Sequence, residues 1–182
     1  LDEWTALVKS KSGERGIFNR GGLEKQLPAR RWDAIKDERQ IGLNPCGEIY
    51  LRSKQFCNLT SIVIRPKDNV ETFKKKMELA TLLGTYQSTL TNFGYLSKKW
   101  KENCEVERLL GVSLTGYYDN PIVRDDKVLD ALKADSIETN KKYAKRFGIN
   151  ASTAITCVKP HGNSGQLLGV GSGMHPWYAP YF

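Results

Sequence analysis

Strand-like and helix-like segments alternate along this chain of 182 residues, and this alternation limits the possible fold more than any other feature. Residues 59–64, 108–114 and 152–158 are short apolar or β-branched runs of the kind found in strands. Between them, apolar residues recur every three or four positions for about 20 residues after Asp68, and again over residues 125–147. Strands that alternate with amphipathic helices are typical of α/β proteins. We therefore expect an α/β fold.

Local signals predict where the helices begin and end. Asp68 followed by Glu71 resembles a capping box, which would begin the first long helix. The other expected boundaries are a helix start at Asp125 or Asp126, a helix end at Gly148, and a short helix near Pro28–Asp37 within otherwise loop-like residues 10–42.

The composition favours a folded, basic protein. Hydrophobic residues make up 40% of the chain, so we expect a buried core, and no apolar run approaches the roughly 20 residues of a membrane helix. The net charge is +8, from 28 basic and 20 acidic residues, which suits nucleic acid or a polyanionic ligand such as a nucleotide. The lysine clusters fall on expected helices, which favours solvated helix faces. We expect neither a membrane span nor direct nucleic-acid binding.

Both ends of the chain suggest a longer protein. Leu1 is not preceded by an initiator Met or a signal-peptide pattern, and residues 176–182 form an aromatic run that further protein would normally cover. We therefore interpret the chain as part of a longer one.

The cysteines indicate thiols rather than a scaffold. The four cysteines (Cys46, Cys57, Cys104 and Cys157) include no C-x-x-C pair, and the chain has two histidines. This pattern argues against a disulfide framework and against a structural zinc site. We expect no metal site, reduced thiols and a cytoplasmic location.

The most informative segment is Asn44-Pro45-Cys46-Gly47-Glu48-Ile49. In extended backbone, residues two apart point the same way, so Asn44, Cys46 and Glu48 would share one face. A carboxylate raises the pKa of a nearby thiol, so this pair suits a thiol that reacts as a neutral hydrogen-atom carrier, with the carboxylate as a separate base. The alternative is a strand with a buried cysteine and an ordinary surface glutamate, and both interpretations stay open from these residues alone.

Together with Phe56-Cys57-Asn58-Leu59, this segment resembles the active-site loop of ribonucleotide reductase large subunits. The separation of 57 − 46 = 11 residues matches the family's spacing between its radical cysteine and one of its redox cysteines. Residues 158–165 and 172–181 agree with later family motifs. The Pro-Cys-Gly-Glu form is most similar to the adenosylcobalamin-dependent ribonucleoside-triphosphate reductases (class II), and the matching motifs run from about Arg15 to the C-terminus.

The resemblance implies an oxidoreductase that converts ribonucleotides, as triphosphates, to 2′-deoxyribonucleotides for DNA synthesis by a thiyl-radical mechanism. Cys46 would become the radical that removes the ribose 3′ hydrogen, Glu48 would take the 3′-hydroxyl proton, and Asn44 would hydrogen-bond the substrate hydroxyls. Cys57 would be one of two reducing thiols, with its partner N-terminal to Leu1. The implied cofactor is adenosylcobalamin, and the implied partner is a thioredoxin-like or dithiol reductant.

The same resemblance bears on the other two cysteines, on the fold and on the substrate-binding residues. Cys104 and Cys157 match no family role, and we interpret them as structural. Residues 1–182 would form about half of a ten-stranded α/β barrel, as a partial catalytic domain with the cysteine loop at its centre and the remainder of the barrel outside the chain. The expected substrate-binding residues are Asn44, Pro45, Cys46, Gly47, Glu48, Pro160, His161, Gly162, Asn163 and Ser164.

The turn at residues 160–164 has a physical interpretation of its own. A strand followed by a Gly-rich turn and a helix from Ser164 or Gly165 would expose backbone N–H groups that can bind phosphate. The turn is neither a Walker A loop nor a G-x-G-x-x-G motif, so its spacing alone is a weak signal. His161 and Gly162 depart from many relatives, and His161 would either contact phosphate or lie at the surface.

Three alternatives are kept. A class I ribonucleoside-diphosphate reductase large subunit would share the loop but take its radical from a separate metal-bearing subunit. A Cys–His hydrolase would use Cys46 with His161 or His175. A basic RNA-binding module is the third alternative, and strong salt dependence of its RNA affinity would identify it.

Overall fold

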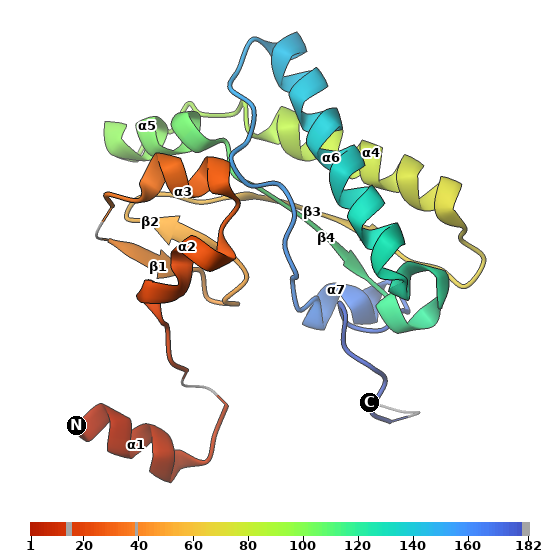
Figure 1. Ribbon diagram of the computed structural model, residues 1–182, viewed down its shortest axis with the longest axis horizontal. Helices are drawn as coiled ribbons and strands as arrows, with labels where there is room; N and C mark the ends of the chain where they lie inside the picture. Colours follow the sequence, from red (N-terminus) through yellow and green to blue (C-terminus); the bar gives the residue numbers. More distant parts are fainter. Residues whose placement is uncertain (14–15, 39, 180–182) are drawn as a thin grey trace.

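The computed structural model describes residues 1–13, 16–38 and 40–179 and has an α/β architecture (Figure 1). The N-terminal part consists of α1 (Asp2–Ser10), the 3₁₀ turn η1 (Arg20–Gly22), α2 (Leu23–Gln26), α3 (Ala29–Ile35), β1 (Ile41–Leu43) and β2 (Tyr50–Arg52). The rest consists of β3 (Asn58–Val63), α4 (Val70–Gln87), α5 (Lys98–Glu107), β4 (Leu110–Thr115), η2 (Tyr117–Asp119), η3 (Ile122–Arg124), α6 (Asp126–Phe147) and α7 (Gly162–Leu167).

The main layer is a parallel strand pair backed by two helices. β3 and β4 pair in register from Asn58↔Leu110 to Val63↔Thr115, and α4 and α6 pack together against one face (Figure 1). Side chains alternate along a strand, so residues two apart on β4, such as Leu110 and Val112, point into the core between the sheet and the helices. Phe73 on α4 lies in the same core and is fully buried. The opposite face of the pair is therefore free to carry polar groups.

The long helices agree with the periodicity, but the start of α4 corrects the expected capping box. Asn69, not Asp68, is the N-cap: its side chain accepts from the Thr72 N–H, and the Thr72 side chain accepts from the Asn69 N–H. The expected partner Glu71 lies in the first turn instead. At the other end of the layer, Gly148 ends α6 in the left-handed conformation, as its position in the sequence predicts.

The run 152–158 is extended but is not a full strand. The N–H groups of Leu110 and Val112 donate to the carbonyls of Ala154 and Ile155, and Val112 and Thr156 form an isolated parallel bridge. A single bridge is too short for a strand. The expected extended backbone is therefore present at residues 152–158, but the expected strand is not. Over the residues that the structure describes, the strands form two two-stranded sheets, β1–β2 and β3–β4, and no closed barrel.

Across the same residues, no helix combines the length and apolar character needed to cross a membrane.

Candidate active site

The expected thiol segment forms the loop of a β-hairpin and not a strand. β1 and β2 pair antiparallel, and residues 44–49 connect them through a tight turn in which the Gly47 N–H donates to the Asn44 carbonyl at 2.9 Å. The Asn44 side chain accepts from the Ile49 N–H at 3.0 Å, and Gly47 adopts φ +78°, which favours glycine. The expectation that Asn44, Cys46 and Glu48 share one face of an extended strand is therefore wrong. Proline at the second position and glycine at the fourth are typical of a β-turn, so the sequence itself contains a signal for the turn that the structure shows.

The loop nevertheless brings its thiol and its carboxylate to one cation. The Nζ atom of Lys159 lies 3.2 Å from Oε1 of Glu48 and 3.8 Å from Sγ of Cys46. Cys46 is exposed, whereas the Glu48 side chain is 2% exposed and that of Lys159 is 27% exposed. The second carboxylate oxygen of Glu48, Oε2, is buried and has no hydrogen-bond partner among the described residues. A buried acceptor without a partner is costly, so the loop presents an oxygen suited to a ligand hydroxyl.

The charge state of Glu48 follows from these contacts. Burial alone would raise the pKa of this carboxyl, but hydrogen bonding from its own backbone N–H, from Asn44 and from Lys159 outweighs burial and lowers the pKa. The ammonium of Lys159 is stabilised in return, because the Glu48 carboxylate raises its pKa against the opposing effect of burial. Glu48 is thus an ionised carboxylate at neutral pH, as a general base requires.

Lys159 is held by the sheet face opposite the helices. Its N–H donates to Oγ of Ser113 on β4 at 3.0 Å, and its carbonyl lies 2.8 Å from Nδ1 of His161. A carbonyl only accepts, so Nδ1 carries the proton and Nε2 accepts from the Ser61 hydroxyl on β3, 2.6 Å away. His161 is 4% exposed, and burial lowers its pKa, so the ring is neutral. His161 does not lie at the surface: it fastens the segment that carries Lys159.

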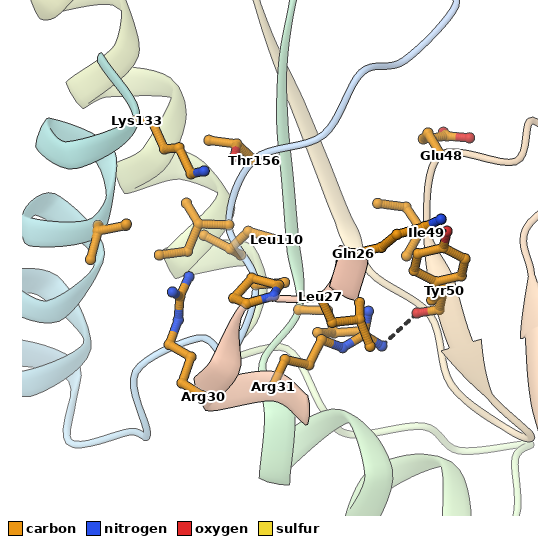
Figure 2. Close-up of a pocket in the computed structure, with 15 residues that line it drawn as sticks. Gln26, Leu27, Arg30, Arg31, Glu48, Ile49, Tyr50, Leu110, Lys133 and Thr156 are labelled. Atoms are coloured by element: carbon orange, nitrogen blue, oxygen red, sulfur yellow. Dashed lines mark hydrogen bonds between the residues drawn. The ribbon is translucent and has the colours of Figure 1, made fainter. Parts of the chain in front are cut away.

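A buried ionic cluster fixes the β2 strand of the hairpin to α3 and α5. Glu107, at the end of α5, is fully buried and contacts Arg31 on α3 and Arg52 on β2, each at 2.9 Å. Gln55 also donates to this carboxylate, and Arg31 donates to the Tyr50 carbonyl (Figure 2). Burial opposes ionisation of Glu107, but the neighbouring arginine charge and hydrogen bonds outweigh it, and its pKa is lowered. The hairpin is therefore held by charge at both its loop and its β2 end.

The remaining cysteines differ in their relation to the site. Burial, reinforced by the negative charge of Glu48, raises the pKa of Cys57 to about 11. Burial, reinforced by Cys57 and then Glu48, raises the pKa of Cys157 to about 12. Both groups are thus neutral thiols at neutral pH, the form that can donate a hydrogen atom. Cys104 is buried on α5, in agreement with a structural role. Cys157, expected to be structural, borders the site.

The 160–164 turn begins a helix earlier than expected. α7 starts at Gly162 rather than at Ser164 or Gly165, with His161 as its N-cap in the left-handed conformation. Gly162, Asn163 and Ser164 are exposed and occupy the first turn, where backbone N–H groups have no partners within the helix. Gly173 backs the turn so closely that a Cβ atom there would lie 2.6 Å from the Lys159 carbonyl.

A cavity of about 210 Å³ lies between α3, α6 and residues 154–156, and Figure 2 shows its lining. Arg30 and Lys133 lie on one side of it, whereas Glu48 and Tyr50 lie on the hairpin side (Figure 2). Ile49 and Tyr50 thus connect the thiol loop to this cavity. No motif in the sequence predicts this cavity.

Comparison with known proteins supports one family. No family model matches the chain. The adenosylcobalamin-dependent ribonucleoside-triphosphate reductase of Lacticaseibacillus paracasei is 28% identical over 207 residues, which cover 97% of this chain and 27% of that protein. The enzyme of the same name from Levilactobacillus brevis is 29% identical over 202 residues, covering 93% of this chain and 26% of that protein. The resemblance to ribonucleotide reductases is confirmed.

Solved structures agree with the curated relatives. A B-12-dependent (class II) ribonucleotide reductase superposes on 78% of this chain and 24% of its own, with a TM-score of 0.62 and 25% identity. The Actinobacillus ureae class Id ribonucleotide reductase alpha subunit covers 98% of this chain and 43% of its own, with a TM-score of 0.63; at 16% identity this likeness concerns the fold alone. The chain spans about a quarter of the length of the curated relatives it matches.

Proposed function

We propose that this chain is the part of a ribonucleotide reductase catalytic chain that carries the radical thiol and the general base, and that the completed enzyme reduces ribonucleoside triphosphates to 2′-deoxyribonucleotides. The observation that carries the proposal is the joint contact of Cys46 and Glu48 with Lys159, with Oε2 of Glu48 buried and without a partner among the described residues. The thiol and the carboxylate thus meet at one cation, which suits a thiol that removes a hydrogen atom and a separate carboxylate that takes a proton.

The proposed division of labour uses the positions of these groups. Cys46, as a thiyl radical, takes the 3′ hydrogen atom of the ribose and becomes a thiol. Oε2 of Glu48 accepts the 3′-hydroxyl proton, and the Asn44 amide, fixed at the start of the loop, orients the substrate hydroxyls. The 2′-hydroxyl leaves as water, and two thiols, one of them Cys57, supply the two electrons and end as a disulfide. The Cys46 thiol then returns its hydrogen atom to C3′ and becomes the thiyl radical again. Its raised pKa keeps Cys57 protonated until it donates.

Adenosylcobalamin is the proposed cofactor, since the curated relatives are named for it. The loop fits such a group on its outer side, because Cys46 is exposed while Glu48 is almost fully buried. Pro45 and Gly47, also exposed, would adjoin the cofactor there. When bound, adenosylcobalamin supplies the radical that oxidises the Cys46 thiol.

The surrounding architecture is part of the same proposal. The face of β3 and β4 opposite α4 and α6 would line the inside of a ten-stranded α/β barrel, of which residues 1–182 form about half. The substrate phosphates would lie at residues 160–164, supported by the exposed first turn of α7. A thioredoxin-like or dithiol reductant in the cytoplasm would restore the Cys57 thiol.

The alternatives are less well supported. A class I diphosphate reductase would use the same loop, and the class Id alpha subunit shares the fold. A Cys–His hydrolase needs a histidine at the thiol, but the hydrogen-bond partners of His161 are Ser61 and Lys159, and that of His175 is the Ser172 carbonyl. The cation beside Cys46 is a lysine.

The test compares two cysteine variants in the enzyme completed by the segments that its relatives have beyond this chain. Cys46→Ser should abolish both cofactor cleavage, followed by the cobalamin absorption spectrum, and deoxynucleotide formation. Cys57→Ser should retain cleavage and lose product formation, because the radical thiol is intact but one reducing thiol is gone. Equal loss of cleavage in both variants would refute the division of roles. The 182-residue chain alone should form no deoxynucleotide, and turnover by it would contradict the proposed partial barrel.

A further inference from the structure

We propose that Lys159 is a positioning residue of the thiol loop, whose ammonium holds the Glu48 carboxylate ionised and aimed beside Cys46. This inference rests on the proposed function, because it assigns the group that prepares the general base. It concerns a residue 111 positions away from Glu48 in the chain, joined to it by a contact that the motif of the loop does not contain.

The geometry of Lys159 is that of a fixed group. Both backbone polar atoms are bonded: the N–H donates to Ser113 on β4, and the carbonyl accepts from His161, which is bonded in turn to Ser61 on β3. The ammonium is therefore delivered from the rigid parallel strand pair onto a hairpin loop. The surface ion pair Lys141–Glu138, by contrast, joins two residues of one helix, and its side chains are 58% and 72% exposed.

The contact also has an electrostatic function. Glu48 is nearly buried, and burial by itself favours the protonated carboxyl, which could not accept a proton. The 3.2 Å contact with Lys159 is the nearest compensating charge. The titratable groups coupled to Glu48 are Lys159, Cys57, Cys157 and His161, and Cys46 contacts the same Lys159 ammonium. The Cys57 and Cys157 thiols and the His161 ring are neutral, so Lys159 supplies the positive charge of this group.

The ammonium also sets the direction of the carboxylate. Oε1 is engaged by Nζ, which leaves the buried Oε2 as the acceptor without a hydrogen-bond partner among the described residues. Since Nζ also contacts Sγ of Cys46, one side chain fixes the distance between the hydrogen-atom carrier and the base. Removal of Lys159 should therefore change both the ionisation of Glu48 and the order of the loop.

The test uses three variants of the 182-residue chain: Lys159→Met removes the charge at similar length, Lys159→Arg retains a cation, and Lys141→Met is the matched control on the exposed pair. The carboxyl carbon of Glu48 is titrated by ¹³C NMR, with folding checked by circular dichroism. Lys159→Met should shift the titration to higher pH, Lys159→Arg should shift it less, and Lys141→Met should leave it unchanged. An unshifted Glu48 titration in folded Lys159→Met would overturn the proposal.

A second readout separates positioning from general damage to the fold. In the completed enzyme, the acidic limb of the kcat/KM profile should move to higher pH in Lys159→Met and recover toward the unmodified rate as pH rises, whereas a misfolded variant would lose activity by the same factor at every pH. The NMR titration needs no turnover. If Glu48→Gln reduced ribonucleotides normally, the proposed function would fail while the Lys159–Glu48 coupling could still be measured.

Discussion

The β1–β2 hairpin depends more on charge than does the helix-backed β3–β4 pair. The strand pair shares an apolar core with α4 and α6 that includes fully buried Phe73 and Ile64. The hairpin consists of two three-residue strands, with a small apolar cluster where Ile41 and Tyr50 pack against α2 and α3. Its other attachments to the rest of the chain include Glu107 with its arginines and Glu48 with Lys159. A dense apolar core gives rigidity, whereas a hairpin held by charges can be adjusted by charge. The chemistry is proposed for the second region, on a frame supplied by the first.

The largest expected effect is on the proposed reaction. Glu48→Gln keeps the size of the side chain but removes the base, and loss of general-base help costs about 10²–10⁴-fold in rate. Nucleotide binding and radical formation should be nearly unchanged in the completed enzyme, as measured by equilibrium binding and by cofactor cleavage. Glu102→Gln, on an exposed pair with Lys99, is the control and should turn over normally. Normal turnover by Glu48→Gln would make the carboxylate an ordinary loop residue.

Next in size is the ionic anchor behind the hairpin. Glu107→Ala leaves Arg31 and Arg52 without their shared carboxylate, and breaking a buried ion pair in this way costs about 3–5 kcal/mol. Phe73→Ala, a cavity mutation in the other region, should cost a similar 3–5 kcal/mol by order of magnitude. Urea unfolding measures both losses, and amide hydrogen exchange distinguishes them. Glu107→Ala should open residues 41–52 first, whereas Phe73→Ala should raise exchange throughout β3 and β4; indistinguishable exchange patterns would remove the contrast between the regions.

The same contrast explains what could be predicted from the sequence. The helices α4 and α6 and the strand β4 each show their character in residues that are close together in the sequence. Local patterns therefore predict them correctly. The contacts of Lys159 with Glu48 and of Arg31 with Glu107 join residues 111 and 76 positions apart, and no local pattern reports them. Pro45 and Gly47 are turn-forming residues, and their preference for a turn outweighs the two-residue alternation of Asn44, Cys46 and Glu48. The spacing of Cys46 and Cys57 was informative because the family keeps it, and not because it defines a geometry.

Acidification should loosen the charged region before the apolar core. The pKa values of Glu48 and Glu107 are lowered from an ordinary 4.5, so their contribution to stability is fully present above 4.5 and is lost as pH falls through the lowered values. Asp68, whose pKa is lowered in spite of burial by hydrogen bonds from Lys76 and the Arg65 N–H, should respond likewise at the start of α4. Hydrogen exchange between pH 6 and 3, corrected for intrinsic rates, should show residues 41–52 opening ahead of β4. Simultaneous opening of both regions would indicate that these carboxylates do not control the hairpin.

The smallest expected effect concerns the cap of α4, within the region that the sequence predicts best. Asn69→Ala removes the side-chain acceptor for the Thr72 N–H and should cost about 1 kcal/mol of unfolding free energy. Glu71 is the residue that the expected box would have required, but it is an exposed side chain in the first turn, so Glu71→Ala should change stability by less than about 0.5 kcal/mol. The two residues lie on the same turn, so the ratio of their effects in matched urea titrations tests the capping assignment directly. A larger loss from Glu71→Ala than from Asn69→Ala would restore the Asp68–Glu71 box and move the start of α4 one residue toward the N-terminus.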